Sequence, residues 1–228
     1  MIKSVIRNVI NSADGLFGLR ALMREGNSSH PLRGDRAIEW SWVVSHLPEQ
    51  NCRILDIGCV ESVLTGIAAR LGHTVTAVDL RDIEYEMPGV AFYKKNIIES
   101  DFKEASFDVI MNCSVIEHVG LPDRYGSTDF QDGDFTAMEK MSRMLSKDGK
   151  MILTIPVGID GEFLPFHRIY GEKRLPLLLA HYNISAEEYW HKAQDERWVL
   201  CDKQTALNTQ GSSEVYALGL FVLEGDKK

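Results

Sequence analysis

Short apolar runs alternate with amphipathic stretches along most of this chain, beginning at residue 53. Six of these runs have the length and the β-branched or aromatic content of strands. They are residues 53–58, 75–80, 90–94, 107–113, 150–156 and 214–224. Because strands that alternate with helices pair into sheets covered by those helices, the pattern predicts a Rossmann-like α/β fold.

Apolar side chains at helical spacing predict three helices beside these strands. One opens at Asp35 and stops before Pro48. A second, over residues 62–71, has an apolar face and ends at Gly72, as a left-handed cap would. A third, over residues 134–145, places a row of methionines on one face, which is typical of core packing.

Two segments exceed what a minimal alternating pattern needs. Residues 119–134 form a polar loop rich in glycine and aspartate, and residues 157–213 form a long excursion before the last strand. Within the excursion, Ser185 and Glu188 form a capping box that predicts a helix. Ligands of open α/β sheets bind beyond the carboxyl ends of the strands, so both segments are expected beside a substrate pocket.

The length of 228 residues fits one domain, residues 1–228, with residues 1–48 as an N-terminal helical cap. Residues 1–24 are predicted either as a docked helix or as a basic amphipathic helix that touches a membrane face or lies over the active site. No apolar run here suits a signal peptide or a transmembrane segment.

Charge and cysteine content narrow the function classes. The formal net charge is −8 and the Lys and Arg residues are scattered, which argues against nucleic acid as a partner. The four cysteines have no zinc-like or C-x-x-C spacing, which predicts free thiols in a reducing cytoplasm.

The turn after the first strand, GCVESV at residues 58–63, has one glycine where a dinucleotide site has three. A carboxylate at Glu61 would also repel a pyrophosphate. A cofactor with an adenosine, a cationic group and no phosphate suits this turn better, and S-adenosylmethionine is such a molecule. Asp79, at the end of the second strand, is placed to accept hydrogen bonds from ribose hydroxyls. Alternatively, Glu61 is a solvated carboxylate that stabilises the helix start.

The order of these features resembles that of the class I S-adenosylmethionine-dependent methyltransferases. The matching segments are LDIGC with the helix after it, VTAVDLRD, Asn96, FDVIMNCSVIEHVGL and MSRMLSKDGKMILTIPVG. Where the family commonly has glycine at the second and fourth positions after Gly58, this chain has Val60 and Ser62.

The resemblance implies a seven-stranded, mostly parallel sheet with an antiparallel last strand, and the sixth strand is expected in residues 197–202 or as a degenerate strand. Segments that include Arg36, Glu39 and FHRIYGEKR look similar to a subgroup associated with glycan or natural-product biosynthesis. The resemblance also implies a cofactor site at the strand ends. Its residues are Asp56, Gly58, Cys59, Glu61, Asp79, Leu80, Asn96, Ile97, Cys113 and Ser114.

Methyl transfer to an oxygen or a protonated nitrogen needs a base beside an aligned acceptor. His118, directly after the fourth strand, is the candidate base, with a structural hydrogen bond as its alternative role. Glu117 would orient a neighbour or the cofactor, and His167 is a further catalytic candidate. These three could instead bind a divalent metal, as in small-RNA methyltransferases, but Ser114 stands where those enzymes have another Glu. A metal is therefore not favoured.

Tyr125, Arg168 and Tyr170 are candidates for acceptor binding, because phenols and a fixed cation suit an acidic or hydroxyl-rich molecule. Arg168 and Tyr170 could instead hold the excursion onto the sheet. One of the four tryptophans is expected to reach the pocket.

The prediction is a cytoplasmic enzyme that transfers a methyl group from S-adenosylmethionine to a small-molecule or glycan acceptor, with O-methylation favoured over N-methylation. One alternative is an NAD(P)-linked oxidoreductase or epimerase in which Arg81 meets a 2′-phosphate. The missing glycines and the lack of a Tyr-x-x-x-Lys pair weigh against it. Another alternative is a protein that binds S-adenosylmethionine without turnover.

Overall fold

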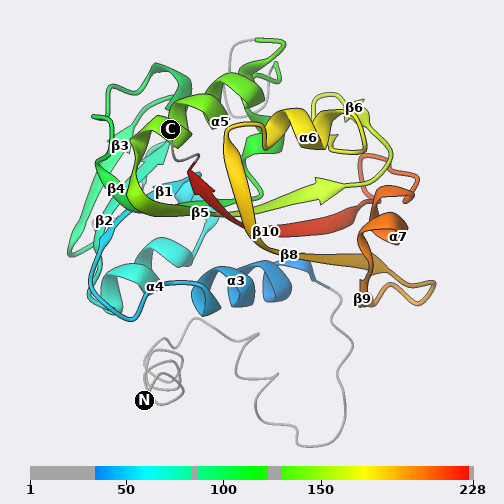
Figure 1. Cartoon of the computed structure of the whole chain (residues 1–228), viewed down its shortest axis with the longest axis horizontal. Coiled ribbons are helices and arrows are strands. Elements are labelled where there is room, and N and C mark those ends of the chain that lie inside the picture. Colours follow the sequence, from blue (N-terminus) through cyan, green and yellow to red (C-terminus); the bar gives the residue numbers. More distant parts are fainter. Residues whose placement is uncertain (1–33, 84–86, 123–129, 226–228) are drawn as a thin grey trace, which may run out of the picture.

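The structure is a computed structural model that describes residues 34–83, 87–122 and 130–225. Eight strands of this part of the chain form one mixed sheet (Figure 1). In spatial order they are β3 (Val90–Lys94), β2 (Thr74–Asp79), β1 (Arg53–Ile57), β4 (Phe107–Cys113), β5 (Leu145–Val157), β10 (Ala217–Gly225), β8 (Tyr182–Lys192) and β9 (Trp198–Cys201). The prediction for residues 1–24 lies outside the described ranges.

Strand directions follow the predicted pattern. β1 pairs in parallel with β2 and with β4, so that Ile54 aligns with Val75 on one side and Val109 on the other. β3 and β5 extend this parallel set, and β10 runs antiparallel to both β5 and β8. The prediction of a mostly parallel sheet with an antiparallel last strand is confirmed.

Helices cover both faces of the sheet (Figure 1). On one face lie α3 (Asp35–Ser45) and α4 (Leu64–Arg70), and on the other lie α5 (Gly133–Met144) and α6 (Arg174–Leu178). Successive side chains of a strand point to opposite faces, so Ile54 packs in the cluster under α3 and α4 while Leu55 packs in the cluster under α5. Met138 and Met141 are fully buried there, and the short α7 (Lys203–Leu207) adds Ala206 to the same cluster.

The excursion differs from its prediction. Ser185 and Glu188 lie within strand β8. The prediction of a helix that starts at their capping box is therefore wrong. A capping box contributes only about 1 kcal/mol, whereas β8 pairs with β10 along most of its length. Residues 197–202 do contain a strand, β9, but it is the edge strand of the sheet. The strand next to the last strand, β10, is β8 instead. The sheet therefore has eight strands in the described chain instead of the expected seven.

Strand order reverses beside β1, because the chain runs outward through β2 and β3 and returns on the other side of β1 as β4. Three 3₁₀ turns follow strands at this end: η1 (Cys59–Glu61), η2 (Ile97–Glu99) and η3 (Ile116–His118). A hairpin of β6 (Gly161–Phe163) and β7 (His167–Ile169) contacts η3. Such a switch point is where open α/β sheets bind ligands. None of the described helices is long and apolar enough to cross a membrane.

Candidate active site

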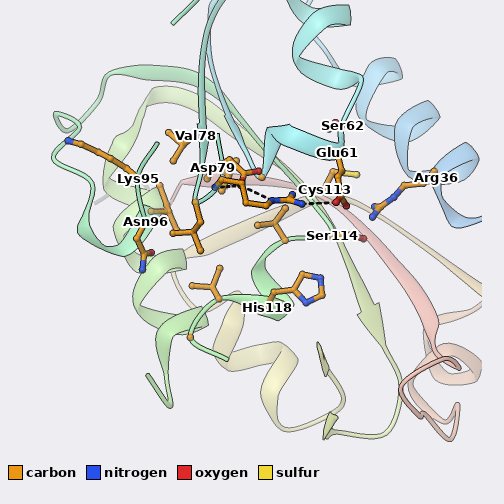
Figure 2. A pocket seen from close by; sticks show the side chains of 18 of the residues that line it. Arg36, Glu61, Ser62, Val78, Asp79, Lys95, Asn96, Cys113, Ser114 and His118 are labelled. Atoms are coloured by element: carbon orange, nitrogen blue, oxygen red, sulfur yellow. Dashed lines mark hydrogen bonds and ion pairs between the residues drawn. The ribbon is translucent and has the colours of Figure 1, made fainter. Parts of the chain in front are cut away.

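A cavity of about 220 Å³ opens at this switch point (Figure 2). It collects residues from α3, the β1–η1 turn, the end of β2, the segment before η2, and the end of β4 with η3. The lining residues are Arg36, Trp40, Ile57, Gly58, Glu61, Ser62, Val78, Asp79, Leu80, Arg81, Lys95, Asn96, Ile97, Cys113, Ser114, Val115, His118, Val119 and Gly120.

Gly58 lets the chain turn at the base of the cavity. Its φ of 74° lies in the left-handed region, and a Cβ added there would stand 2.3 Å from Cγ2 of Val115. The Gly58 N–H donates to the Val78 carbonyl oxygen at 2.8 Å. Because the turn before η1 passes so close to Val115, which precedes η3, only glycine fits at position 58. The turn then places Glu61 and Ser62 in the cavity lining.

One guanidinium links two carboxylates of the cavity lining, and Figure 2 labels these carboxylates, Glu61 and Asp79. Arg81 donates from Nη1 to Glu61 Oε1 at 2.6 Å and from Nε to Asp79 Oδ1 at 3.3 Å. The second oxygen of Asp79 accepts the Val60 N–H at 3.0 Å. Asp79 Oδ1 also accepts the Arg81 N–H at 3.0 Å, so both lone pairs of this oxygen are used, while Oδ2 retains one lone pair for a hydroxyl.

The next wall comes from Leu80, Lys95, Asn96 and Ile97. Asn96 is fixed because its Oδ1 accepts the Ile98 N–H at 3.0 Å and caps η2. Lys95 is paired with Asp101 at 2.6 Å. The combination of apolar side chains with a fixed amide suits a flat heterocycle.

At the opposite end, Ser114 has an uncommon φ of 51°. Its N–H donates to the Thr154 carbonyl oxygen at 3.0 Å, and its hydroxyl donates to Glu39. Burial raises the pKa of Glu39. Arg36 and the hydroxyl groups of Ser114 and Thr154, which donate to this carboxylate, oppose that shift. Burial also raises the pKa of the neighbouring Cys113 thiol well above its usual value, so Cys113 is not a thiolate nucleophile.

His118 lies on η3 and faces the cavity (Figure 2). Its Nδ1 is 2.7 Å from the Phe166 carbonyl oxygen, which has no proton to give, so Nδ1 carries the hydrogen. Neutral His118 therefore has its lone pair on Nε2. Glu117 is buried beside it, with Oε1 3.7 Å from Nε2.

Most of the predicted cofactor residues line this one cavity. They are Gly58, Glu61, Asp79, Leu80, Asn96, Ile97, Cys113 and Ser114. Asp56 and Cys59 do not line it. Asp56 is buried and accepts a hydrogen bond from Thr65 of α4, and burial raises its pKa to about 7. Cys59 is buried too, and burial raises the pKa of its thiol to about 12.

Among the predicted catalytic and acceptor residues that the structure describes, His118 lines the cavity, whereas Glu117, His167, Arg168 and Tyr170 do not. His167 packs edge-on against Tyr216, with ring centroids 5.4 Å apart. Arg168 is buried and donates to the Val119 and Gln131 carbonyl oxygens at 2.7 and 3.4 Å. Tyr170 donates to buried Asp134 at 3.0 Å. These contacts hold the excursion against η3 and α5, while Tyr125 lies outside the described residues.

Several lining residues escaped the site prediction, Arg36 and Lys95 among them, while Trp40 is the one of the four tryptophans that lines the cavity. Arg36 and Trp40 are four positions apart, and that spacing places them on one side of α3. Nothing in the sequence indicates that this side faces the carboxyl ends of the strands. No group of three or more His, Cys, Asp or Glu within residues 34–83, 87–122 and 130–225 is arranged to hold a metal ion.

Relatives of known structure share this architecture. A 1,6-didemethyltoxoflavin-N1-methyltransferase from Burkholderia thailandensis, solved with S-adenosylhomocysteine, superposes with a TM-score of 0.53 at 18% identity, over 98% of this chain and 89% of that one. The N-methyltransferase NodS from Bradyrhizobium japonicum WM9, also solved with S-adenosylhomocysteine, gives a TM-score of 0.55 at 15% identity, over 91% and 97%.

Among curated proteins, a ubiquinone biosynthesis O-methyltransferase from Pelagibacter ubique is 34% identical over 119 residues. That match covers 48% of this chain and 44% of the relative, so the chain spans less than half the length of this relative. The family described as "Caenorhabditis protein of unknown function, DUF268" matches residues 77–220, more than half of the chain. The chain belongs to that family, and its fold is that of the class I S-adenosylmethionine-dependent methyltransferases.

Proposed function

We propose that this protein is a methyltransferase that uses S-adenosylmethionine. The observation that carries the proposal is the gathering of Gly58, Asp79, Asn96, Ser114 and His118 around one cavity at the switch point. The names of the relatives support it, because both O- and N-methyltransferases occur among them.

The chain's own residues fit this cofactor. Gly58 lets the chain turn sharply against Val115, and this turn brings Glu61 and Ser62 to the cavity that would hold the cofactor. Asp79 Oδ2 would accept a ribose hydroxyl, and Leu80 and Ile97 would enclose the adenine. Arg81 is engaged by Glu61 and Asp79, which disfavours the alternative in which it meets a 2′-phosphate.

Bound S-adenosylmethionine supplies a methyl group on a cationic sulfur that leaves as a neutral thioether. His118 acts as the base and takes the acceptor proton at Nε2, while the Phe166 carbonyl keeps the proton on Nδ1 and stabilises the imidazolium. Glu117, 3.7 Å from Nε2, adds to that stabilisation. The surrounding walls align the acceptor and exclude water.

We infer a small hydroxylated acceptor, sugars included, with oxygen favoured over nitrogen because His118 is placed to remove a hydroxyl proton. Reaction at a cytoplasmic location accords with the four free cysteines. Arg168 and Tyr170 would act on the acceptor only by fixing the loops that border it.

Calorimetry with S-adenosylhomocysteine and NADPH, each with EDTA and with added Mg²⁺, tests the proposal. We expect S-adenosylhomocysteine to bind in both solutions and NADPH not to bind. Asp79→Asn should weaken S-adenosylhomocysteine about tenfold or more, because one strong acceptor of the ribose hydroxyls is lost. Asp82→Asn is the matched control, since Asp82 is exposed and paired with Lys94. Binding of NADPH alone, or of neither ligand, would overturn the proposal.

A further inference from the structure

The turn η3, from which His118 faces the cavity (Figure 2), is held by the hairpin of β6 and β7. The Phe166 carbonyl oxygen, directly before β7, lies 2.7 Å from Nδ1 of His118. Arg168, the middle residue of β7, donates from Nη1 at 2.7 Å to the carbonyl oxygen of Val119, the residue that ends η3. Two groups that lie two residues apart in the hairpin therefore hold two adjacent residues of the turn.

Arg168 makes this contact as a buried cation. Its side chain is 1% exposed, whereas that of Glu162 in β6, whose Oε2 accepts the Arg168 Nε–H at 3.2 Å, is 47% exposed. Its Nη2 donates to the Gln131 carbonyl oxygen at 3.4 Å. Each nitrogen of the guanidinium thus has a partner, and the three partners belong to β6, to the end of η3 and to the segment before α5.

A buried charge is a costly way to fill space. Desolvation of a cation is offset only when its donors meet acceptors in good geometry, and an apolar side chain of similar volume would serve packing alone at least as well. The planar guanidinium adds direction, because it fixes the Val119 carbonyl relative to β7. The adjacent His118 is then fixed relative to the Phe166 carbonyl, although these two residues lie 48 positions apart in the chain.

We propose that Arg168 is a positioning residue that fixes η3 against β7 and so keeps the proton of neutral His118 on Nδ1 and its lone pair on Nε2. The hydrogen bond made by one ring nitrogen decides which tautomer an imidazole adopts, so the carbonyl that selects the tautomer must be held in place. The use of Nε2 as a base rests on the proposed function. The tautomer itself is a property of the folded protein and is measured without any methyl acceptor.

Nuclear magnetic resonance of protein labelled with ¹⁵N-histidine tests the proposal at about pH 8.5, where an imidazole of ordinary pKa is neutral. The His118 signals are assigned by their loss in His118→Gln. We expect the wild type to show the Nδ1–H form of His118, and Arg168→Met, which lacks donors, to show a mixture of both tautomers. Hydrogen exchange of the amides of residues 116–119 should become about tenfold faster or more in Arg168→Met.

Tyr182→Phe is the matched control. The buried Tyr182 hydroxyl donates to the Met138 carbonyl oxygen at 2.7 Å, so this variant also loses a buried hydrogen bond to a backbone carbonyl, but one of α5 instead of η3. We expect it to unfold at lower urea concentration and to keep the wild-type tautomer of His118. Equal changes at His118 in both variants would indicate general loosening and would overturn the proposal, as would Arg168→Met with wild-type tautomer and exchange.

Arg168→Lys keeps the buried charge and serves if Arg168→Met fails to fold. Its ammonium group cannot meet the Val119 and Gln131 carbonyls and Glu162 in one plane. Exchange of residues 116–119 should therefore be at least about threefold faster than in the wild type. Wild-type exchange in Arg168→Lys would overturn the proposal.

Affinity for S-adenosylhomocysteine separates this proposal from the proposed function. We expect it to change by less than twofold in Arg168→Met, because Arg168 acts on η3 and does not line the cavity. A larger loss would mean that the whole cavity is disturbed and would overturn a role confined to η3. Wild-type protein that binds no S-adenosylhomocysteine contradicts the proposed function, whereas normal binding with an unaffected His118 signal in Arg168→Met contradicts only the positioning role.

Discussion

Glycine at position 58 is required by two separate constraints, a positive φ and the distance to Val115. We expect Gly58→Ala to lower the free energy of unfolding by about 2 kcal/mol or more, since both strain and overpacking oppose the methyl group. Adding Val115→Ala should recover part of this loss. Gly34→Ala is the control, because nothing lies within 4 Å of its added Cβ. Equal effects of both alanines in chemical denaturation would contradict the expectation.

The tautomer of His118 makes a second residue-level prediction. If Nε2 takes the acceptor proton, His118→Ala should reduce acceptor-dependent turnover about 10²-fold or more, with unchanged affinity for S-adenosylhomocysteine. His181→Ala is the control, because His181 is exposed on the excursion. Turnover in His118→Ala that equals the control would remove His118 from the mechanism.

The sequence predicts which residues line the cavity where they end a parallel strand or lie on the turn after it. Asp79, the last residue of β2, and His118, on the turn after β4, are such residues, because parallel strands end at one edge of the sheet. It does not predict Arg36 or Trp40 as cavity residues, since their helix precedes β1 and its docking depends on packing between distant segments. Successive side chains of a strand point to opposite faces of the sheet, and the side chain of Asp56 in β1 points to Thr65 of α4.

Asp56 joins β1 to α4 through its hydrogen bond with Thr65, but its buried carboxyl group makes the stability of the fold depend on pH. Burial raises its pKa to about 7, the Thr65 hydrogen bond opposes that shift, and Asp79 adds to it. In the unfolded chain the carboxyl titrates near its ordinary value of about 4. Between these pH values the folded state holds the extra proton, so this group's contribution to stability falls as pH rises through the window.

The Asp56→Asn variant keeps an oxygen that accepts the Thr65 hydroxyl, but its amide does not titrate in this pH range. The variant should therefore gain stability relative to the wild type as pH rises from 4 to 8, by at most about 4 kcal/mol. Urea denaturation at pH 4, 6 and 8 measures this, with the exposed Asp101→Asn as control. A difference between Asp56→Asn and wild type that does not change with pH would contradict the assignment.

The pattern of apolar residues predicts helices and strands correctly where its periodicity is strong, and it fails in the excursion, residues 157–213. The runs that became β1, β2 and β4 are mostly buried and flanked by turns, so local and tertiary preferences agree. β8 is largely polar and exposed along its first half, and its capping box imitates a helix start. Pairing with β10, which is distant in sequence, decides its structure.

The whole molecule depends on β10, which separates the parallel strands from β8 and β9. It contributes Leu218, Leu220, Phe221 and Leu223 to the buried core. A chain that stops after Tyr216 loses pairing on both sides of this strand, and we expect it to lack a cooperative thermal transition. A sharp transition with a native near-ultraviolet circular dichroism spectrum would show that the remaining strands fold without it.

The central place of β10 also sets an order of events during translation. β8 and β9 leave the ribosome before the strand that joins them to β5 has been synthesised. Until then their antiparallel pair can form, but the face that receives Phe221 and Leu223 stays in contact with water or with a chaperone. The nascent chain therefore reaches its native sheet only after residues 217–225 have emerged, although the cavity is lined by residues made much earlier.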